Sequence, residues 1–109
     1  MKRNAKLYLE DIKDSLKKIK KYIRGLSFEG FRKDAKTQDA VIRNLEIIGE
    51  AANNIPRESK SKYPRVPWKE IVGMRNKVIH EYFGVDVEIL WKTIKEDIPE
   101  LERSLKKSK

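Results

Sequence analysis

Apolar residues recur along most of the chain at intervals of three and four, a spacing that places them on one face of an α-helix. This spacing predicts two long amphipathic helices: one over residues 5–26, and one that begins at about residue 33 or 36 and ends at Pro56. Between them, Ser27 is a suitable N-cap for a short turn. No stretch alternates apolar and polar residues as a half-buried strand would, so the chain is expected to be helical.

The second half of the chain predicts a third helix after a loop. Residues 56–67 hold three prolines and four basic side chains and are expected to form that loop. Pro67 suits the first turn of a helix that runs to about Phe83, with Gly84 as its C-cap. His80 would then lie in the last turn, where the helix dipole favours the protonated imidazolium and raises its pKa.

A last helix is expected after Asp86, which is a good N-cap. Pro99 falls inside its apolar stripe and predicts a kink or break near Asp97. The basic tail from about Ser104 is expected to fray. The fold class predicted from these patterns is all-α, an up-and-down antiparallel helical bundle that forms one domain over residues 1–109.

The net charge and its distribution along the chain suggest a polyanionic partner. The chain has 109 residues and a net charge of +9, and residues 1–24 carry nine basic and three acidic side chains, whereas residues 81–102 carry seven acidic and two basic ones. The basic surface should therefore lie on the first helix and the 57–69 segment. Such a surface favours polyanions such as RNA, although charge alone does not separate RNA from DNA or anionic lipid.

Composition also excludes several classes of site. The chain has no cysteine, which excludes disulfides, thiolate metal sites and cysteine nucleophiles, and its single histidine argues against a clustered zinc site. We therefore expect no metal and no cofactor. No apolar run approaches 18 residues and no signal peptide is recognisable, so a cytoplasmic protein without membrane association is expected.

The candidate chemistry lies in residues 72–84, where the only histidine, His80, follows Arg75 by five positions. At 100° per residue, a continuous helix would place Arg75 on the apolar face with Tyr82, and Asn76 and His80 on the rim. An unpaired buried guanidinium is costly, so Arg75 should face a cleft, a partner helix or a second subunit.

These residues carry a resemblance. Residues 75–82, Arg-Asn-Lys-Val-Ile-His-Glu-Tyr, resemble the Arg-x4-His-x-Tyr signature of the HEPN superfamily, and specifically of HepT toxins paired with MNT-type nucleotidyltransferase antitoxins. Residues 36–52 are also similar to HepT-like proteins, as is the approach to the motif through Pro67, Trp68, Ile71 and Gly73. The similarity runs from the first helix to about Leu105.

The resemblance implies a metal-independent endoribonuclease that acts as the toxin of a toxin–antitoxin pair. It implies a homodimer in which two copies of the motif meet at one cleft, because a single chain offers only one histidine. Arg75 would stabilise phosphate charge, His80 would act as general acid or base, and Asn76 and Tyr82 would position the substrate. The partners would be RNA and the cognate nucleotidyltransferase, in a dimer or a larger hetero-oligomer.

The resemblance further implies that the nucleotidyltransferase attaches AMP to Tyr82, which adds bulk and negative charge at the cleft. Glu50 has two interpretations: a partner for Arg75 that shapes the site, or an exposed helix glutamate. It lies within a run of small residues, Gly49, Ala51 and Ala52, which suggests that another backbone passes close by.

Two alternatives remain open at this point. The protein could be a non-catalytic subunit of a minimal nucleotidyltransferase that binds RNA or nucleotide through the same Arg75 and His80 groove. It could also be a purely structural helical dimer, but that interpretation gives Arg75 no purpose on an apolar face.

Overall fold

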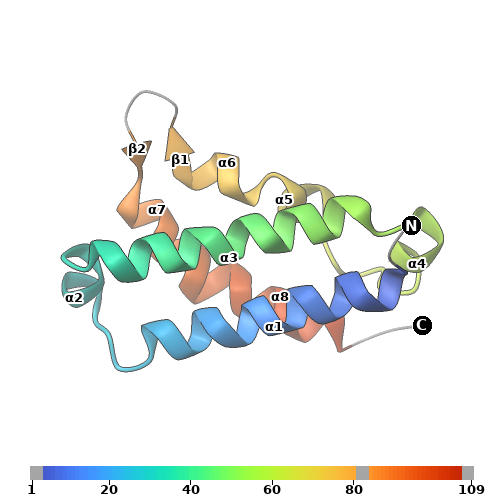
Figure 1. Ribbon diagram of the computed structural model, residues 1–109, viewed down its shortest axis with the longest axis horizontal. Coiled ribbons are helices and arrows are strands. Elements are labelled where there is room, and N and C mark those ends of the chain that lie inside the picture. Colours follow the sequence, from blue (N-terminus) through green and yellow to red (C-terminus); the bar gives the residue numbers. More distant parts are fainter. Residues whose placement is uncertain (1–3, 81–83, 107–109) are drawn as a thin grey trace.

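The structure is a computed structural model that describes residues 4–80 and 84–106 (Figure 1). It is mostly helical, which confirms the predicted all-α class. Its elements in chain order are α1 (Ala5–Ile23), α2 (Phe28–Arg32), α3 (Ala35–Asn54), α4 (Arg57–Lys60), α5 (Trp68–Val72), α6 (Met74–Val78), β1 (Ile79–His80), β2 (Gly84–Val85), α7 (Val87–Lys92), the π-helical turn η1 (Thr93–Asp97) and α8 (Ile98–Leu105).

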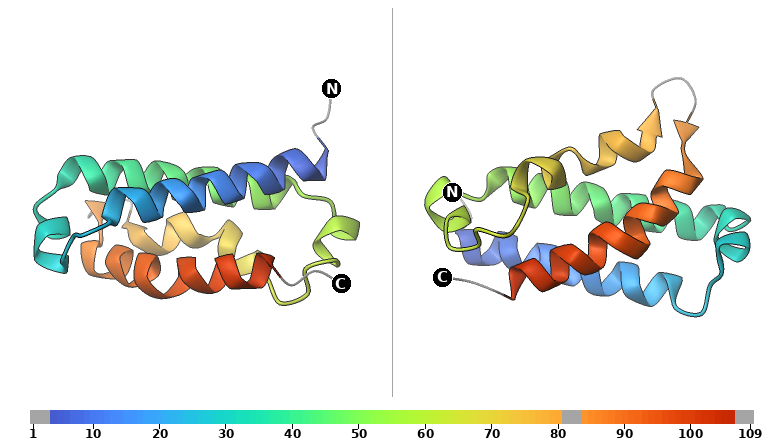
Figure 2. Two further views of the ribbon diagram at one scale, coloured as in Figure 1. Left: turned by 90° about the horizontal axis from the view of Figure 1, so that it is seen from below. Right: turned by 180° about the vertical axis from the view of Figure 1, so that it is seen from behind.

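The helices form two layers. The long antiparallel helices α1 and α3 pack side by side in one layer, and α5–α6 and the α7–η1–α8 run form the other (Figure 2). The short helix α4 lies in the connection that was expected to be a loop, at the end of the molecule where α1 begins (Figure 1). Within the described ranges, no helix is long and apolar enough to cross a membrane.

Side-chain caps fix where several helices begin. The Ser27 hydroxyl oxygen accepts a hydrogen bond from the backbone N–H of Gly30 at 3.1 Å, and the Asp86 carboxylate accepts one from that of Ile89 at 3.1 Å. Each satisfies a backbone donor that has no partner inside its helix. Both predicted caps are therefore confirmed, and Asp34 caps α3 in the same way.

The core lies between the two layers. Its largest fully buried apolar side chains come from α1, α2, α3, α7, η1 and α8 and include Ile12, Leu16, Ile19, Phe31, Leu45, Ile48, Leu90, Ile94 and Ile98. Burying each one stabilises the fold by about 1.5–3 kcal/mol relative to leaving it exposed. Trp91 is partly buried and packs against this core, with its ring centroid 5.0 Å from that of Phe31.

The small residues of α3 do mark a close backbone approach. A β-carbon on Gly49 would lie 3.2 Å from the carbonyl oxygen of Val72 and 3.4 Å from that of Ile71. Any larger residue at this position would press on the backbone of α5 where α3 supports it. This confirms the prediction from the small-residue run, and it fixes the position of the chain just before the motif.

The expected helix over residues 67–83 is wrong in two places, and the first is Gly73. Helix α5 ends at this glycine, whose backbone N–H donates to the Lys69 carbonyl oxygen at 3.2 Å, and α6 begins immediately after it. Glycine is a poor helix former because it loses the most backbone freedom on ordering. The continuous helix on which Arg75 was expected to project from the apolar face therefore does not form.

The second difference is that α6 ends earlier than the expected helix end at about Phe83. The helix stops at Val78, and the chain continues as a two-stranded antiparallel hairpin in which Ile79 pairs with Val85 and His80 pairs with Gly84. The β-branched pair of valine and isoleucine favours a strand at this point. Gly84 is not a helix C-cap; its φ of 74° lies in the left-handed region that glycine adopts freely. The helix-dipole argument for the pKa of His80 therefore does not apply.

The irregularity expected near Asp97 occurs as a π-helical turn within a continuous helical run and not as a break, and fraying does not begin at Ser104. The α-helical pattern changes to the π-helical turn η1 over Thr93–Asp97, just before Pro99 enters α8. Since proline lacks a backbone N–H and clashes with the preceding turn, the change falls where a regular helix is least favourable. Ser104 and Leu105 are buried in α8, so the helix is intact beyond the expected start of the tail. The end of the tail, residues 107–109, lies outside the described residues.

Candidate functional site

The predicted site residues fall on α6 and the hairpin that follows it. The backbone of Arg75 lies in α6 and that of His80 lies in β1, opposite Gly84. The side chains of Arg75 and His80, and the whole of Tyr82, lie outside the described part of the structure. Two predicted residues, Asn76 and Glu50, have described positions, and both are exposed.

Asn76 and Glu50 line the same surface hollow although they are far apart in sequence. The hollow has a volume of about 280 Å³ and lies between α3 and the α5–α6 segment; its lining residues are Leu45, Glu46, Gly49, Glu50, Asn53, Val72 and Asn76. We call it the α3-side hollow. Glu50 is thus an exposed helix glutamate, as one interpretation expected, and it also lies beside the motif, as the other required.

Two further polar residues of this hollow were missed in the sequence. Glu46 and Asn53 stand four residues before and three residues after Glu50, so they lie on the same face of α3. That spacing could have indicated them. Carboxylate and amide oxygens are the acceptors that a guanidinium needs when it leaves bulk water. The hollow can therefore hold a positive charge next to α6.

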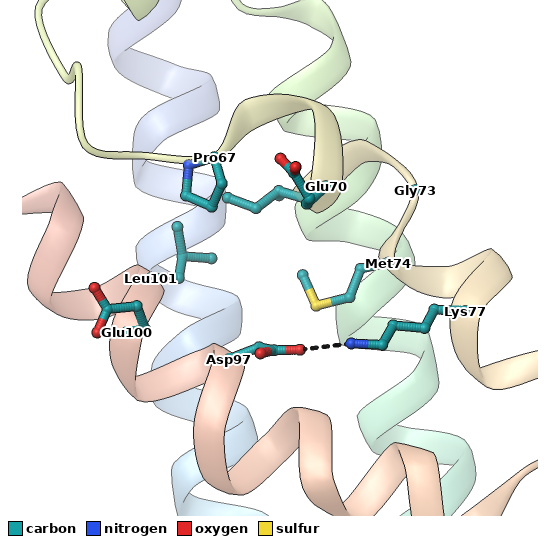
Figure 3. Close-up of a pocket in the computed structure, with 9 residues that line it drawn as sticks. Pro67, Glu70, Gly73, Met74, Lys77, Asp97, Glu100 and Leu101 are labelled. Carbon is teal, nitrogen blue, oxygen red and sulfur yellow. Dashed lines mark hydrogen bonds and ion pairs between the residues drawn. The ribbon is translucent and has the colours of Figure 1, made fainter.

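A second hollow lies on the other side of the motif helices and is drawn in Figure 3. It has a volume of about 400 Å³, and we call it the α8-side hollow. Ile71, Met74 and Leu101 provide apolar surface, and the carboxylates of Glu70, Asp97 and Glu100 surround it. These charges make it a poor site for a phosphate.

Among the described residues that line the α8-side hollow, Lys77 is the one basic side chain. Its Nζ lies 3.2 Å from Asp97 Oδ2, so the ion pair joins α6 to η1 (Figure 3). Both side chains are about half exposed, at 55% and 49%. Exposed pairs of this kind contribute little stability, about 0–1 kcal/mol. The pair therefore neutralises one carboxylate but does not make the hollow basic.

Three side chains at the corner between α2 and α3 have displaced pKa values. Hydrogen bonds from the Thr37 hydroxyl and backbone N–H lower the pKa of Asp34. The hydrogen bond and charge of Arg32 lower the pKa of Glu29, whose carboxylate in turn raises the pKa of Arg32. These groups hold a helix end and a surface ion pair, and they lie outside both hollows. Among residues 4–80 and 84–106, no group of three or more His, Cys, Asp or Glu side chains is arranged to hold a metal ion.

The fold is an all-α, HEPN-like bundle in which α6 packs against α3 and leads into the hairpin that bears His80. The family model described as "Ribonuclease HepT-like" matches residues 12–108. The chain belongs to the HepT-like ribonuclease family. No solved structure matches the chain.

Whole-chain relatives agree with the family model. The chain is 55% identical over 107 residues to the protein named "Probable ribonuclease HepT" of Thermococcus cleftensis, with 98% of this chain and 97% of that protein covered. It is 52% identical to a candidate RNase of Caldanaerobacter subterraneus subsp. tengcongensis, covering 91% and 88% of the two chains. A candidate RNase of Methanocaldococcus jannaschii is 43% identical, with 96% and 90% covered.

Proposed function

We propose that this protein is a metal-independent endoribonuclease whose active site is built from Arg75 and His80. The observation that carries the proposal is the family match over residues 12–108, which includes the whole Arg-x4-His-x-Tyr motif. RNA is the proposed substrate. The net charge of +9 supports a polyanionic substrate.

The proposed reaction uses the RNA's own 2′-hydroxyl as the nucleophile. A base removes the 2′ proton as that oxygen attacks the adjacent phosphorus, and an acid protonates the departing 5′-oxygen, so the products are a 2′,3′-cyclic phosphate and a 5′-hydroxyl end. His80 carries a proton in one of these two steps, because imidazole titrates near neutral pH. Arg75 stabilises the added negative charge on the phosphate oxygens, and Asn76 and Tyr82 position the RNA.

A two-fold dimer completes this proposed site. One chain supplies a single histidine, whereas base and acid act on opposite sides of the phosphorus. Two copies of α6 and the hairpin would bring two histidines and two arginines to one cleft. Within each chain, the α3-side hollow supports the role of Arg75, since Glu46 and Glu50 offer carboxylates that can orient its guanidinium. The single-domain organisation of residues 1–109 stays a prediction as well.

We further propose that the ribonuclease is the toxin of a toxin–antitoxin pair and that an MNT-type nucleotidyltransferase neutralises it. The modification site is Tyr82. A transferred AMP would place a phosphodiester and a nucleoside at the cleft, and both would oppose RNA by charge and by bulk. Co-expression with a cognate nucleotidyltransferase should add the mass of AMP to the wild type and leave Tyr82→Phe unmodified; an unchanged wild-type mass would contradict this part of the proposal.

The proposed ribonuclease is tested with metal-free protein and total RNA in EDTA. Wild type should cleave the RNA, and Arg75→Ala and His80→Ala should lose at least about a hundredfold in rate, the scale of a lost general acid or charge stabiliser. Lys77→Gln is the matched control, because it removes a neighbouring positive charge from α6 at a position that the Arg-x4-His-x-Tyr pattern leaves open. Light scattering reports whether each variant is still a dimer.

A folded wild-type dimer that binds RNA but never cuts it would support the non-catalytic binding module instead. Mixed dimers sharpen the test of a shared cleft. Adding an excess of the doubly substituted Arg75→Ala/His80→Ala chain should lower the activity per wild-type chain if both copies contribute to one site. Unchanged activity per wild-type chain would show that each copy acts alone.

A further inference from the structure

The two hollows that flank α5 and α6 are both lined by carboxylates, so neither supplies a basic surface for a long phosphate chain. Such a surface occurs elsewhere in the fold. The lysine-rich first helix and the basic 57–69 segment, far apart in sequence, come together where α1 begins and α4 lies (Figure 1). The hollow between them has a volume of about 340 Å³ and is lined by Ala5, Lys6, Leu9, Glu10, Lys13, Ser59, Lys62 and Tyr63. We call it the α1–α4 hollow.

The lining of this hollow carries three lysines and one carboxylate, so its charge is positive. Lys6 and Lys13 are seven residues apart and so lie on one face of α1, and Lys62 approaches from the other segment. Glu10 is the single carboxylate in the lining. None of the three lysines forms an ion pair with another described residue, and all three are exposed. Their ammonium groups are therefore free to bind an anion.

The hollow also has an apolar and aromatic wall. Tyr63 lines it and packs edge-on against Trp68, with ring centroids 6.5 Å apart and an interplanar angle of 78°. Lys60 places its Nζ 5.8 Å from the centre of the Trp68 ring, which adds positive charge behind the same wall. Lysines combined with an aromatic surface are the usual composition of a site for single-stranded nucleic acid, in which ammonium groups hold phosphates and a ring contacts a base.

We propose that the α1–α4 hollow is a second RNA-binding site, which holds the phosphodiester backbone of a single-stranded segment of the same RNA that is cut at the motif. This inference rests on the proposed ribonuclease function. The hollow and the hairpin that bears His80 lie toward opposite ends of the molecule's long axis, whose extent is 41 Å (Figure 1). An RNA that fills both sites of one chain must therefore be long, and a short oligonucleotide bound at the motif does not reach the hollow of the same chain.

The test compares Lys13→Gln/Lys62→Gln with a control that removes the same charge elsewhere. Lys18→Gln/Lys33→Gln is that control: both lysines are exposed and outside the hollow, and Lys18 lies about 140° around α1 from Lys13. Binding is measured in an Arg75→Ala/His80→Ala background, so that cleavage does not interfere. The test variant should bind a long single-stranded RNA about tenfold more weakly at 0.1 M salt, with a salt slope smaller by about 1.4, as expected for two lost phosphate contacts.

Kinetics of the active protein give a second readout. The test variant should raise KM for the long RNA without changing kcat, and should leave both constants unchanged for a short oligonucleotide. Equal weakening by the control pair, or no weakening by the test pair, would overturn the proposal. If wild type cuts no RNA yet the test pair alone weakens binding, the ribonuclease proposal fails and the binding site stands.

Discussion

Gly49 of α3 meets the backbone of Val72 so closely that a β-carbon on the glycine would lie 3.2 Å from the valine carbonyl oxygen. The contact lies at the last residue of α5, two residues before α6 begins at Met74 and carries the backbone of Arg75. Helix α3, which contributes no residue to the motif, thus packs against the segment that leads into it. The α3-side hollow opens beside the same contact, since both residues line it.

Gly49→Ala tests this support. The atom that the new methyl group would meet belongs to the backbone and cannot rotate away, so α5 must shift or carry strain. We expect a loss of about 1–3 kcal/mol in the free energy of unfolding, measured by denaturant titration, together with reduced RNA cleavage. Gly30→Ala is the control, because its methyl group would make ordinary contacts at 3.5 Å or more and alanine favours a helix. Equal stability of Gly49→Ala and wild type would contradict the supporting role of this glycine.

Two glycines have positive φ, and comparing their alanine variants distinguishes an effect on the motif from a general loss of stability. Gly84 (φ 74°) lies in the motif hairpin and Gly25 (φ 77°) lies between α1 and α2, and a methyl group added to either glycine would meet no other atom within 4 Å. Alanine at either site should cost about 1–2 kcal/mol of stability. RNA cleavage at a temperature where both variants are folded should fall for Gly84→Ala and stay near wild type for Gly25→Ala. Equal activities would show that the hairpin geometry does not matter.

The lowered pKa of Asp34 predicts how stability changes in acid. Its carboxylate is bound better in the folded state, so its stabilising contribution is complete above the ordinary pKa of 3.8 and is lost as the pH falls through the lower native value. Asp34→Asn keeps an oxygen that can cap α3 but does not titrate. Denaturation midpoints at pH 7 and pH 3 should therefore differ more for wild type than for this variant, with Asp39→Asn as a charge control. The same acid loss in Asp34→Asn would refute the assignment.

The carboxylates of the α8-side hollow are expected to lie off the RNA path. Asp97→Asn breaks the half-exposed ion pair with Lys77 and should cost less than about 1 kcal/mol, with the difference vanishing at high salt. KM for RNA should stay within about twofold of wild type or fall slightly, because one negative charge is gone. A several-fold rise in KM would place RNA in this hollow after all.

Much of the fold follows from local patterns. The long apolar stripes predict α1 and α3, and Ser27 and Asp86 were identified as caps because a short polar side chain before an apolar run has few other roles. The close approach at Gly49 was also predictable in kind, since small residues cluster there. Which backbone makes the approach could not be predicted, because it depends on tertiary packing.

The hairpin shows where such patterns fail. Helical spacing continued through Val78 and Ile79, yet these β-branched residues and the left-handed Gly84 favour turning the chain back. Two residues of strand are too short to leave an alternating pattern in the sequence. The hollow that Glu50 and Asn76 share could not be predicted either, because contacts between residues distant in sequence are set by how α3 packs on α6.

In the proposed mechanism, Arg75 and His80 promote attack of the RNA's own 2′-hydroxyl on the adjacent phosphorus. The most direct measurement incubates metal-free wild-type protein in EDTA with two RNAs. The first is an RNA that the protein cuts at one known position, and the second is the same RNA with a single 2′-deoxy substitution at that position. The proposed mechanism predicts cleavage of the first RNA alone, with 2′,3′-cyclic phosphate ends that disappear in His80→Ala. Cleavage of the deoxy-substituted RNA at the same bond, or full activity in His80→Ala, would contradict it.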